Sequence, residues 1–87
     1  MAITIYESPN CSGCRLTKVV LNRESIPYQT VDLSTDLDAY RAVKALGHKQ
    51  APVVGVTYPD GTEEHWGGLR PDKLNTYITA VKGAQAA

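Results

Sequence analysis

The chain has 87 residues, of which 43% are hydrophobic and 21% charged, an ordinary globular composition. This length predicts one domain, over 1–83, followed by a flexible tail over 84–87. Nine Lys and Arg residues balance nine Asp and Glu residues, which argues against a nucleic-acid or anionic-membrane partner. Because we find no signal peptide and no long apolar run, we expect a cytoplasmic protein without a membrane segment. We also expect a monomer.

The first part of the chain predicts a β-α-β unit. A β-branched and aromatic run over 2–6 favours a strand. Helical spacing then predicts a helix that has Cys11 at its cap and extends to Ser25, where Pro27 ends it. An alternating run over 28–33 predicts a second strand, parallel to the first. The residues expected on the buried face of the helix are Leu16, Val19, Val20 and Arg23.

A second helix is expected from Thr35 to Gly47. Thr35 and Asp38 have the spacing of a capping box, and Gly47 is well placed as the C-terminal stop. Its expected apolar stripe is Leu37, Tyr40, Val43 and Leu46.

A hairpin and a last helix complete the pattern. The turn residues over 59–61 separate two β-rich runs, 53–58 and 62–66, of which the second is expected at the sheet edge. Pro71 then begins a helix that Gly83 ends, with Leu74, Tyr77, Ile78 and Val81 facing the core. The order β-α-β-α-β-β-α predicts an α/β fold with helices on both sheet faces.

The two cysteines form a C-x-x-C motif, Cys11-Ser12-Gly13-Cys14. A bridge between them closes a small loop and constrains the unfolded chain little, so the pair reads as reactive rather than structural. At a strand-to-helix junction, the positive end of the helix dipole stabilises a thiolate. We therefore expect Cys11 to be the nucleophile and Cys14 to resolve the mixed disulfide.

Other interpretations of the cysteine pair stay open at this point. The same motif is half of a zinc site, but a full site needs about four ligands, and His48 and His65 are the other candidates. Two unreactive cysteines, a cluster-binding module and a redox sensor are further alternatives.

Two more segments attract attention. In the first segment, Ala51-Pro52-Val53, a proline begins a strand. An ordinary trans proline is allowed at this position, so the sequence alone does not indicate a cis peptide bond. The run Trp66-Gly67-Gly68-Leu69-Arg70-Pro71 is a glycine turn in which we expect Trp66 to be partly buried. Arg70 is a poor helix cap, which suggests that its guanidinium ties down this loop.

These motifs resemble those of the NrdH-redoxins, glutaredoxin-like proteins with thioredoxin-like activity, and the likeness extends from Ile3 to about Val81. The most specific part is the family's Trp-Ser-Gly-Phe-Arg-Pro loop. Gly67 and Leu69 replace its Ser and Phe here, and Ser12-Gly13 replaces the family's usual Val-Gln or Met-Gln. The matching residues of the loop are Trp66, Gly68, Arg70 and Pro71.

The resemblance implies a thioredoxin fold with a four-stranded mixed sheet, flanked by three helices. It implies a cis proline at Pro52, no bound metal or cofactor, and a redox-active Cys11–Cys14 disulfide. Its dithiol form would reduce a class Ib ribonucleotide reductase in deoxyribonucleotide synthesis, and thioredoxin reductase would regenerate it. A glutathione-dependent glutaredoxin is the main alternative. The expected partner-binding surface is largely apolar and includes Ser8, Pro9, Ser12, Gly13, Ala51, Pro52, Val53, Trp66, Gly67, Gly68 and Arg70.

Overall fold

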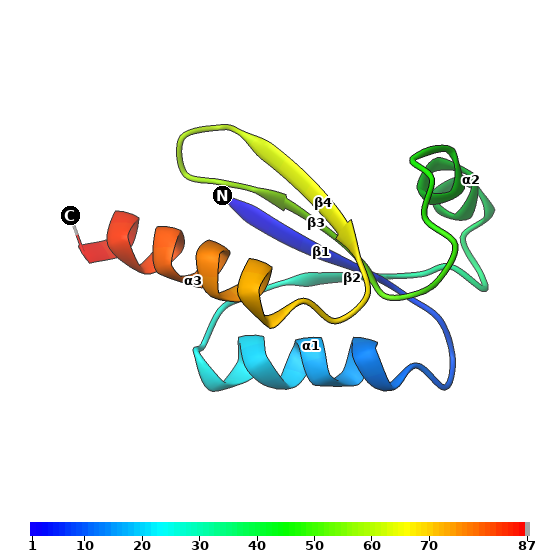
Figure 1. The fold of residues 1–87 in the computed structure, drawn as a ribbon, viewed down its shortest axis with the longest axis horizontal. Helices are drawn as coiled ribbons and strands as arrows, with labels where there is room; N and C mark the ends of the chain where they lie inside the picture. The colour runs from blue at the N-terminus through cyan, green and yellow to red at the C-terminus, as the bar shows by residue number, and fades with distance from the viewer. Residues whose placement is uncertain (87) are drawn as a thin grey trace.

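Four strands and three helices follow one another in the predicted order in the computed structural model, which describes residues 1–86 (Figure 1). The strands are β1 Ala2–Glu7, β2 Gln29–Asp32, β3 Val53–Thr57 and β4 Glu63–Gly67. The helices are α1 Ser12–Arg23, α2 Leu37–Ala45 and α3 Pro71–Ala86. Within this part of the chain, no helix is long and apolar enough to cross a membrane.

The strands form one mixed sheet in the order β2-β1-β3-β4. β1 and β2 are parallel, whereas β3 is antiparallel to both β1 and β4. β4 is the antiparallel edge strand that the hairpin signal predicted. This sheet and its three helices form the thioredoxin-like fold that the resemblance implied.

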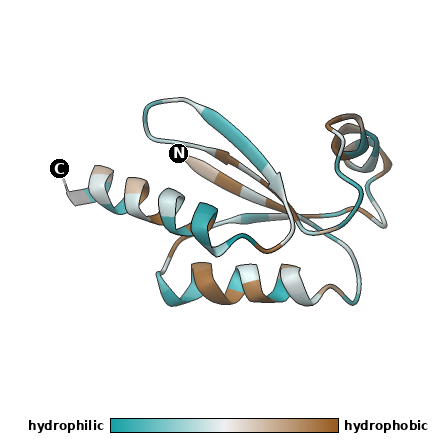
Figure 2. Cartoon of the chain, in the orientation of Figure 1, coloured by the Kyte–Doolittle hydropathy of each residue, from teal (hydrophilic) through white to brown (hydrophobic). Residues whose placement is uncertain are grey.

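The core lies between the sheet and the helices α1 and α3, which pack side by side on one sheet face (Figure 1). Alternate residues of β1 and β3 point into it, because successive strand residues face opposite sides. The buried residues of this cluster are Ile3, Ile5, Leu21, Ile26, Val54, Val56, Trp66, Leu74, Tyr77, Ile78 and Val81. Apolar residues stand out on β1, β3 and α1 in Figure 2.

The buried face predicted for α1 is correct only at Val20, which is partly buried and packs against the core. Leu16 and Val19 are exposed, by 49% and 38%, whereas Cys14, Thr17 and Leu21 face the core. Thr17 can be buried because its hydroxyl donates a 2.7 Å hydrogen bond to the carbonyl of Gly13. Hydrophobic spacing considers only apolar side chains. It therefore misses Cys14 and the hydrogen-bonded Thr17, which occupy two positions of the buried face.

The end of α1 also differs from the prediction. The helix stops at Arg23, and Ser25 adopts a left-handed φ of 55°. The N–H of Ile26 bonds the carbonyl of Leu21 at 2.9 Å, and that of Ser25 bonds the carbonyl of Asn22 at 3.1 Å. This is a Schellman motif, so the backbone turns before Pro27 is reached.

α2 departs from its predicted cap and packing. Asp36, not Thr35, is the N-cap, because its carboxylate accepts the N–H of Ala39 at 3.0 Å. Val43 is buried, but the rest of the predicted stripe is exposed: Leu37, Tyr40 and Leu46. A cavity of about 900 Å³ lies between α2 and the sheet face opposite α1 and α3. α2 therefore covers its face only loosely, as its position at one end of the sheet shows (Figure 1).

α3 begins at Pro71 as predicted but does not end at Gly83. It continues to Ala86, because an exposed glycine with open space around it weakens a helix without forcing it to stop. The predicted tail over 84–87 is therefore helical as far as Ala86, and residue 87 lies outside the described residues.

Two leucines on α1 test the corrected face. Leu21→Ala should lower the free energy of unfolding by about 2–5 kcal/mol, because it empties a fully buried site. Leu16→Ala, the same chemical change on the exposed side, should cost less than about 1 kcal/mol. Urea unfolding of both variants measures the difference, and equal losses would restore the stripe predicted from spacing.

Candidate active site

The two cysteines lie where β1 gives way to α1. β1 ends at Glu7, and the following turn closes with Asn10 at a left-handed φ of 59°. Cys11 then takes an extended conformation, with φ −106° and ψ 104°, and is the N-cap of α1. This is the position in which the sequence predicted Cys11.

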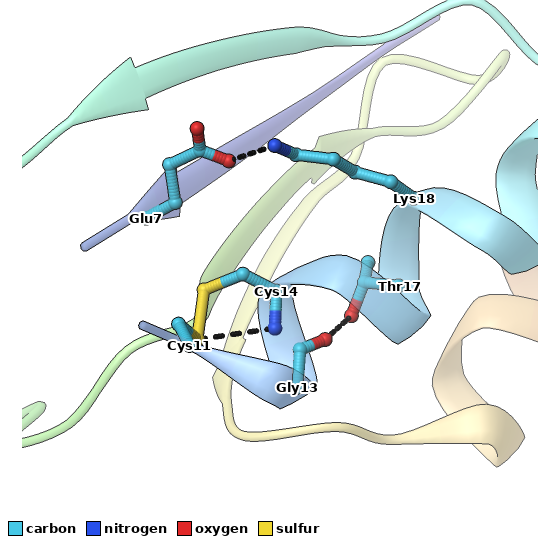
Figure 3. The surroundings of a disulfide bond; sticks show 6 residues. All are labelled: Glu7, Cys11, Gly13, Cys14, Thr17 and Lys18. Carbon is cyan, nitrogen blue, oxygen red and sulfur yellow. Dashed lines mark hydrogen bonds and ion pairs between the residues drawn. A yellow bond between two sulfur atoms is a disulfide. The ribbon is translucent and has the colours of Figure 1, made fainter. Parts of the chain in front are cut away.

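The sulfur of Cys11 replaces the usual oxygen of an N-cap side chain. It accepts the backbone N–H of Cys14 at 3.1 Å (Figure 3). The first N–H groups of a helix lack intrahelical partners and carry the positive end of its dipole. Negative charge on this sulfur is therefore stabilised by the backbone itself, without a charged side chain.

Cys11 and Cys14 are joined by a disulfide, with their Cα atoms 5.3 Å apart. Cys14 is only 4% exposed and belongs to the buried face of α1, whereas Cys11 is partly exposed. A partner molecule therefore reaches the sulfur of Cys11 more easily than that of Cys14. The arrangement is suited to reversible thiol–disulfide exchange.

Three chain segments meet beside the disulfide. The Ala51–Pro52 peptide bond is cis, and a Cβ atom on Gly13 would lie 3.0 Å from Cδ of Pro52. The carbonyl of Pro52 accepts the N–H of Gly68 at 2.8 Å, and Gly68 has a left-handed φ of 84°. Glycine at 13 allows the close approach to Pro52, and glycine at 68 allows the turn.

The other predicted surface residues divide into exposed and buried sets. Pro9, Ser12 and Gly67 are exposed, and Ser8 and Ala51 are partly exposed. Trp66 is not the partly buried loop residue that we expected, because it is 4% exposed and belongs to the core. Val53 is 1% exposed, so its side chain also faces the interior. The burial of these two side chains leaves only backbone at these positions for a partner to contact.

Arg70 does not tie down the loop as expected, because its guanidinium pairs with a carboxylate only two residues further along the chain. Its guanidinium makes a bidentate contact with Asp72, at 3.0 Å and 2.9 Å, in the first turn of α3. This contact lowers the pKa of Asp72 to about 2. The side chain of Arg70 therefore pairs with a carboxylate in the first turn of α3, and its backbone carbonyl accepts the N–H of Leu74.

Two features beside the cysteines escaped the sequence analysis. Glu7 and Lys18 form an ion pair next to the disulfide (Figure 3). A groove of about 620 Å³ also adjoins the site, and its lining includes Ser8 and Ala51 together with Tyr40, Val43 and His48. The spacing of Cys14 and Lys18, four residues apart on one helix, could have pointed to the first feature.

Within the described residues, the zinc-ligand candidates named from the sequence do not form one site with the cysteines. Within residues 1–86, no three His, Cys, Asp or Glu side chains come together as metal ligands. His48 and His65 contact each other instead, with Nε2 of His48 2.7 Å from Nδ1 of His65.

Comparison with known proteins agrees with this geometry. The glutaredoxin family model matches residues 3–57. The glutaredoxin-like protein NrdH of Salmonella typhimurium is 33% identical over 86 residues, which cover 99% of this chain and all of the relative. The gene 56 protein of Mycobacterium phage L5 is 34% identical over 77 residues, which cover 87% of this chain and 71% of that protein.

Solved structures give the same result. The chain is similar to NrdH-redoxin from Escherichia coli, described as a glutaredoxin-like protein with a thioredoxin-like activity profile. The TM-score is 0.77 at 30% identity, and the match covers 87% of this chain and 93% of that one. A thioredoxin-like protein named BC3987 matches with a TM-score of 0.70, at 26% identity.

The unequal exposure of the two sulfurs leads to a prediction for the reduced protein. Iodoacetamide at neutral pH should alkylate Cys11 at least about tenfold faster than Cys14, because Cys11 is accessible and caps the helix. Peptide mapping by mass spectrometry after short exposure measures the ratio. In denaturant the two rates should converge, and a faster reaction at Cys14 in the folded protein would contradict the geometry.

Proposed function

The chain belongs to the glutaredoxin family and is an NrdH-like thiol–disulfide oxidoreductase, and from this premise we propose that it carries electrons to a class Ib ribonucleotide reductase. Thioredoxin reductase, supplied by NADPH, regenerates its dithiol. The observation that carries the chemistry is the sulfur of Cys11 at the N-terminus of α1, hydrogen-bonded to the N–H of Cys14.

In the proposed cycle Cys11 is the nucleophile and Cys14 the resolving residue. The Cys11 thiolate attacks one sulfur of the acceptor's disulfide, and the other sulfur leaves as a thiolate that takes up a proton. Cys14 loses its proton and attacks the sulfur of Cys11, which releases the second acceptor thiolate. This thiolate takes up the proton that the Cys11 thiol had released to solvent, so the acceptor gains two electrons and two protons, and the redoxin keeps the Cys11–Cys14 disulfide.

The choice of partners rests on the relatives. NrdH glutaredoxin-like proteins match nearly the full length of the chain. The Escherichia coli NrdH-redoxin is described as having a thioredoxin-like activity profile. We propose the same thioredoxin-like activity for this chain, and we propose in addition a role in deoxyribonucleotide synthesis and a cytoplasmic location. The protein acts as a monomer that binds each partner in turn, with no bound metal or cofactor.

The proposed docking surface surrounds Cys11. It includes the exposed or partly exposed residues Ser8, Pro9, Ser12, Gly13, Ala51, Gly67, Gly68 and Arg70, and the backbone at Pro52, Val53 and Trp66. Because one small surface serves two protein partners, binding to each is expected to be weak and short-lived.

Glutathione is the alternative electron source, and the charges near Cys11 make it less favourable. The tripeptide has two carboxylates, and Arg15, Lys49 and Arg70 were the nearby cations expected from the sequence. Arg70 already holds Asp72. That pairing leaves fewer cations to hold glutathione than the sequence suggested.

A comparison of two reducing systems tests the electron source. Insulin reduction should proceed with NADPH and thioredoxin reductase, and should be at least about tenfold slower with glutathione and glutathione reductase. The Cys11→Ser variant should be inactive in both systems and serves as the control. Faster turnover with glutathione would replace the proposal by a glutathione-dependent glutaredoxin.

A trapping experiment tests the roles of the cysteines and the acceptor together. Cys14→Ser should form a stable mixed disulfide between Cys11 and a class Ib ribonucleotide reductase, because the resolving thiol is missing. Non-reducing electrophoresis with mass spectrometry identifies the linked cysteines. No adduct with Cys14→Ser, or an equal adduct with Cys11→Ser, would contradict the assignment.

A further inference from the structure

We propose that the ion pair between Glu7 and Lys18 regulates the stability of the thiolate at the cysteine pair, and so the redox equilibrium of the protein. The inference rests on thiol–disulfide exchange by Cys11 and Cys14, and it is independent of which reductase or acceptor is used.

The pair and the two cysteines line one open surface cavity. Its volume is about 340 Å³, and its lining includes Cys11 and Cys14 together with Glu7 and Lys18. Lys18 lies one helical turn beyond Cys14 on α1, and Glu7 is the last residue of β1. Figure 3 shows the pair beside the disulfide, bridging the strand and the helix that hold it.

The two charges are partly withdrawn from water. The side chains of Glu7 and Lys18 are 23% and 31% exposed, and Oε2 of Glu7 is buried. This oxygen is the atom that pairs with the ammonium of Lys18, and within residues 1–86 it has no other hydrogen-bond partner. Charges in such surroundings act on their neighbours more strongly than charges in bulk water.

The pair is close to neutral as long as both members are present. Arg15 is the other charged residue that lines the cavity, and together with the dipole of α1 it favours a thiolate. Removing the carboxylate of Glu7 would add the unpaired charge of Lys18 to this positive field. Removing Lys18 would leave a carboxylate beside the sulfurs, which opposes a thiolate.

Two near-isosteric variants therefore have opposite expected effects. Glu7→Gln should lower the pKa of the Cys11 thiol and Lys18→Met should raise it, each on the order of one unit. Because a stable thiolate favours the dithiol form, Glu7→Gln should also make the protein more oxidising and Lys18→Met more reducing. The double variant should return close to the unmodified protein.

Two measurements with small molecules follow these changes. The pH dependence of thiolate ultraviolet absorbance gives the thiol pKa, and equilibration with defined glutathione ratios gives the exchange constant. Each variant should change that constant about tenfold, in opposite directions. Neither assay contains a reductase or an acceptor protein, so its outcome is separable from that of the reductase comparison.

A second ion pair provides the matched control. Lys82 and Glu24 connect α3 to the C-terminal end of α1, and their side chains are 51% and 43% exposed. Glu24→Gln and Lys82→Met remove the same chemical groups without touching the cavity that contains the cysteines. They should leave the thiol pKa and the exchange constant unchanged.

The proposal fails under either of two results. If Glu7→Gln and Lys18→Met shift the thiol pKa in the same direction, the cause is a change of packing rather than of charge. If they shift it no more than the control variants do, the pair is only a structural link between β1 and α1. Thermal unfolding of all four variants shows whether each is folded at the assay temperature.

Discussion

The hydrogen bond from the N–H of Cys14 to the sulfur of Cys11 is the interaction on which the site depends. It requires the helix to begin directly after Cys11, so that the second cysteine falls within the first turn. The same bond satisfies an otherwise unpaired N–H and directs the positive end of α1 at the reactive sulfur. One local interaction thus caps the helix and activates the sulfur.

The sheet determines what surrounds that helix start. Tyr6 of β1 pairs with Val53 of β3, and Val53 pairs with Gly67 of β4. Because β3 is antiparallel to both neighbours, the last residues of β1, the first residues of β3 and the last residues of β4 lie at the same end of the strands. The cysteines, Pro52 and Gly68 are next to these strand ends. The register therefore brings together residues that are far apart in the sequence.

The order of the elements, the cysteine site and the buried face of α3 could be predicted from local pattern, whereas the buried faces of α1 and α2 could not. The strands are short runs between clear turn residues, and the C-x-x-C motif defines its own position on α1. The predictions for α1 and α2 failed where polar groups decide the outcome, at Thr17 and at Asp36. Hydrophobic spacing also does not reveal how closely a helix packs on the sheet. Leu37 and Tyr40 have the spacing of buried residues, but they are exposed because α2 covers its sheet face only loosely.

The location of an ion pair, rather than its presence, decides its consequence. Glu64 contacts Lys73 and Tyr58, which lowers its pKa, and burial together with this carboxylate raises the pKa of Tyr58 to about 12. That cluster connects β4 to α3 and lies outside the cavity that contains the sulfurs. Glu7 and Lys18 have the same chemistry, but they line the cavity into which the charge of a thiolate would extend. In our proposal, residues that look like ordinary surface charges in the sequence act on the reaction because the fold places them in one cavity with the cysteines.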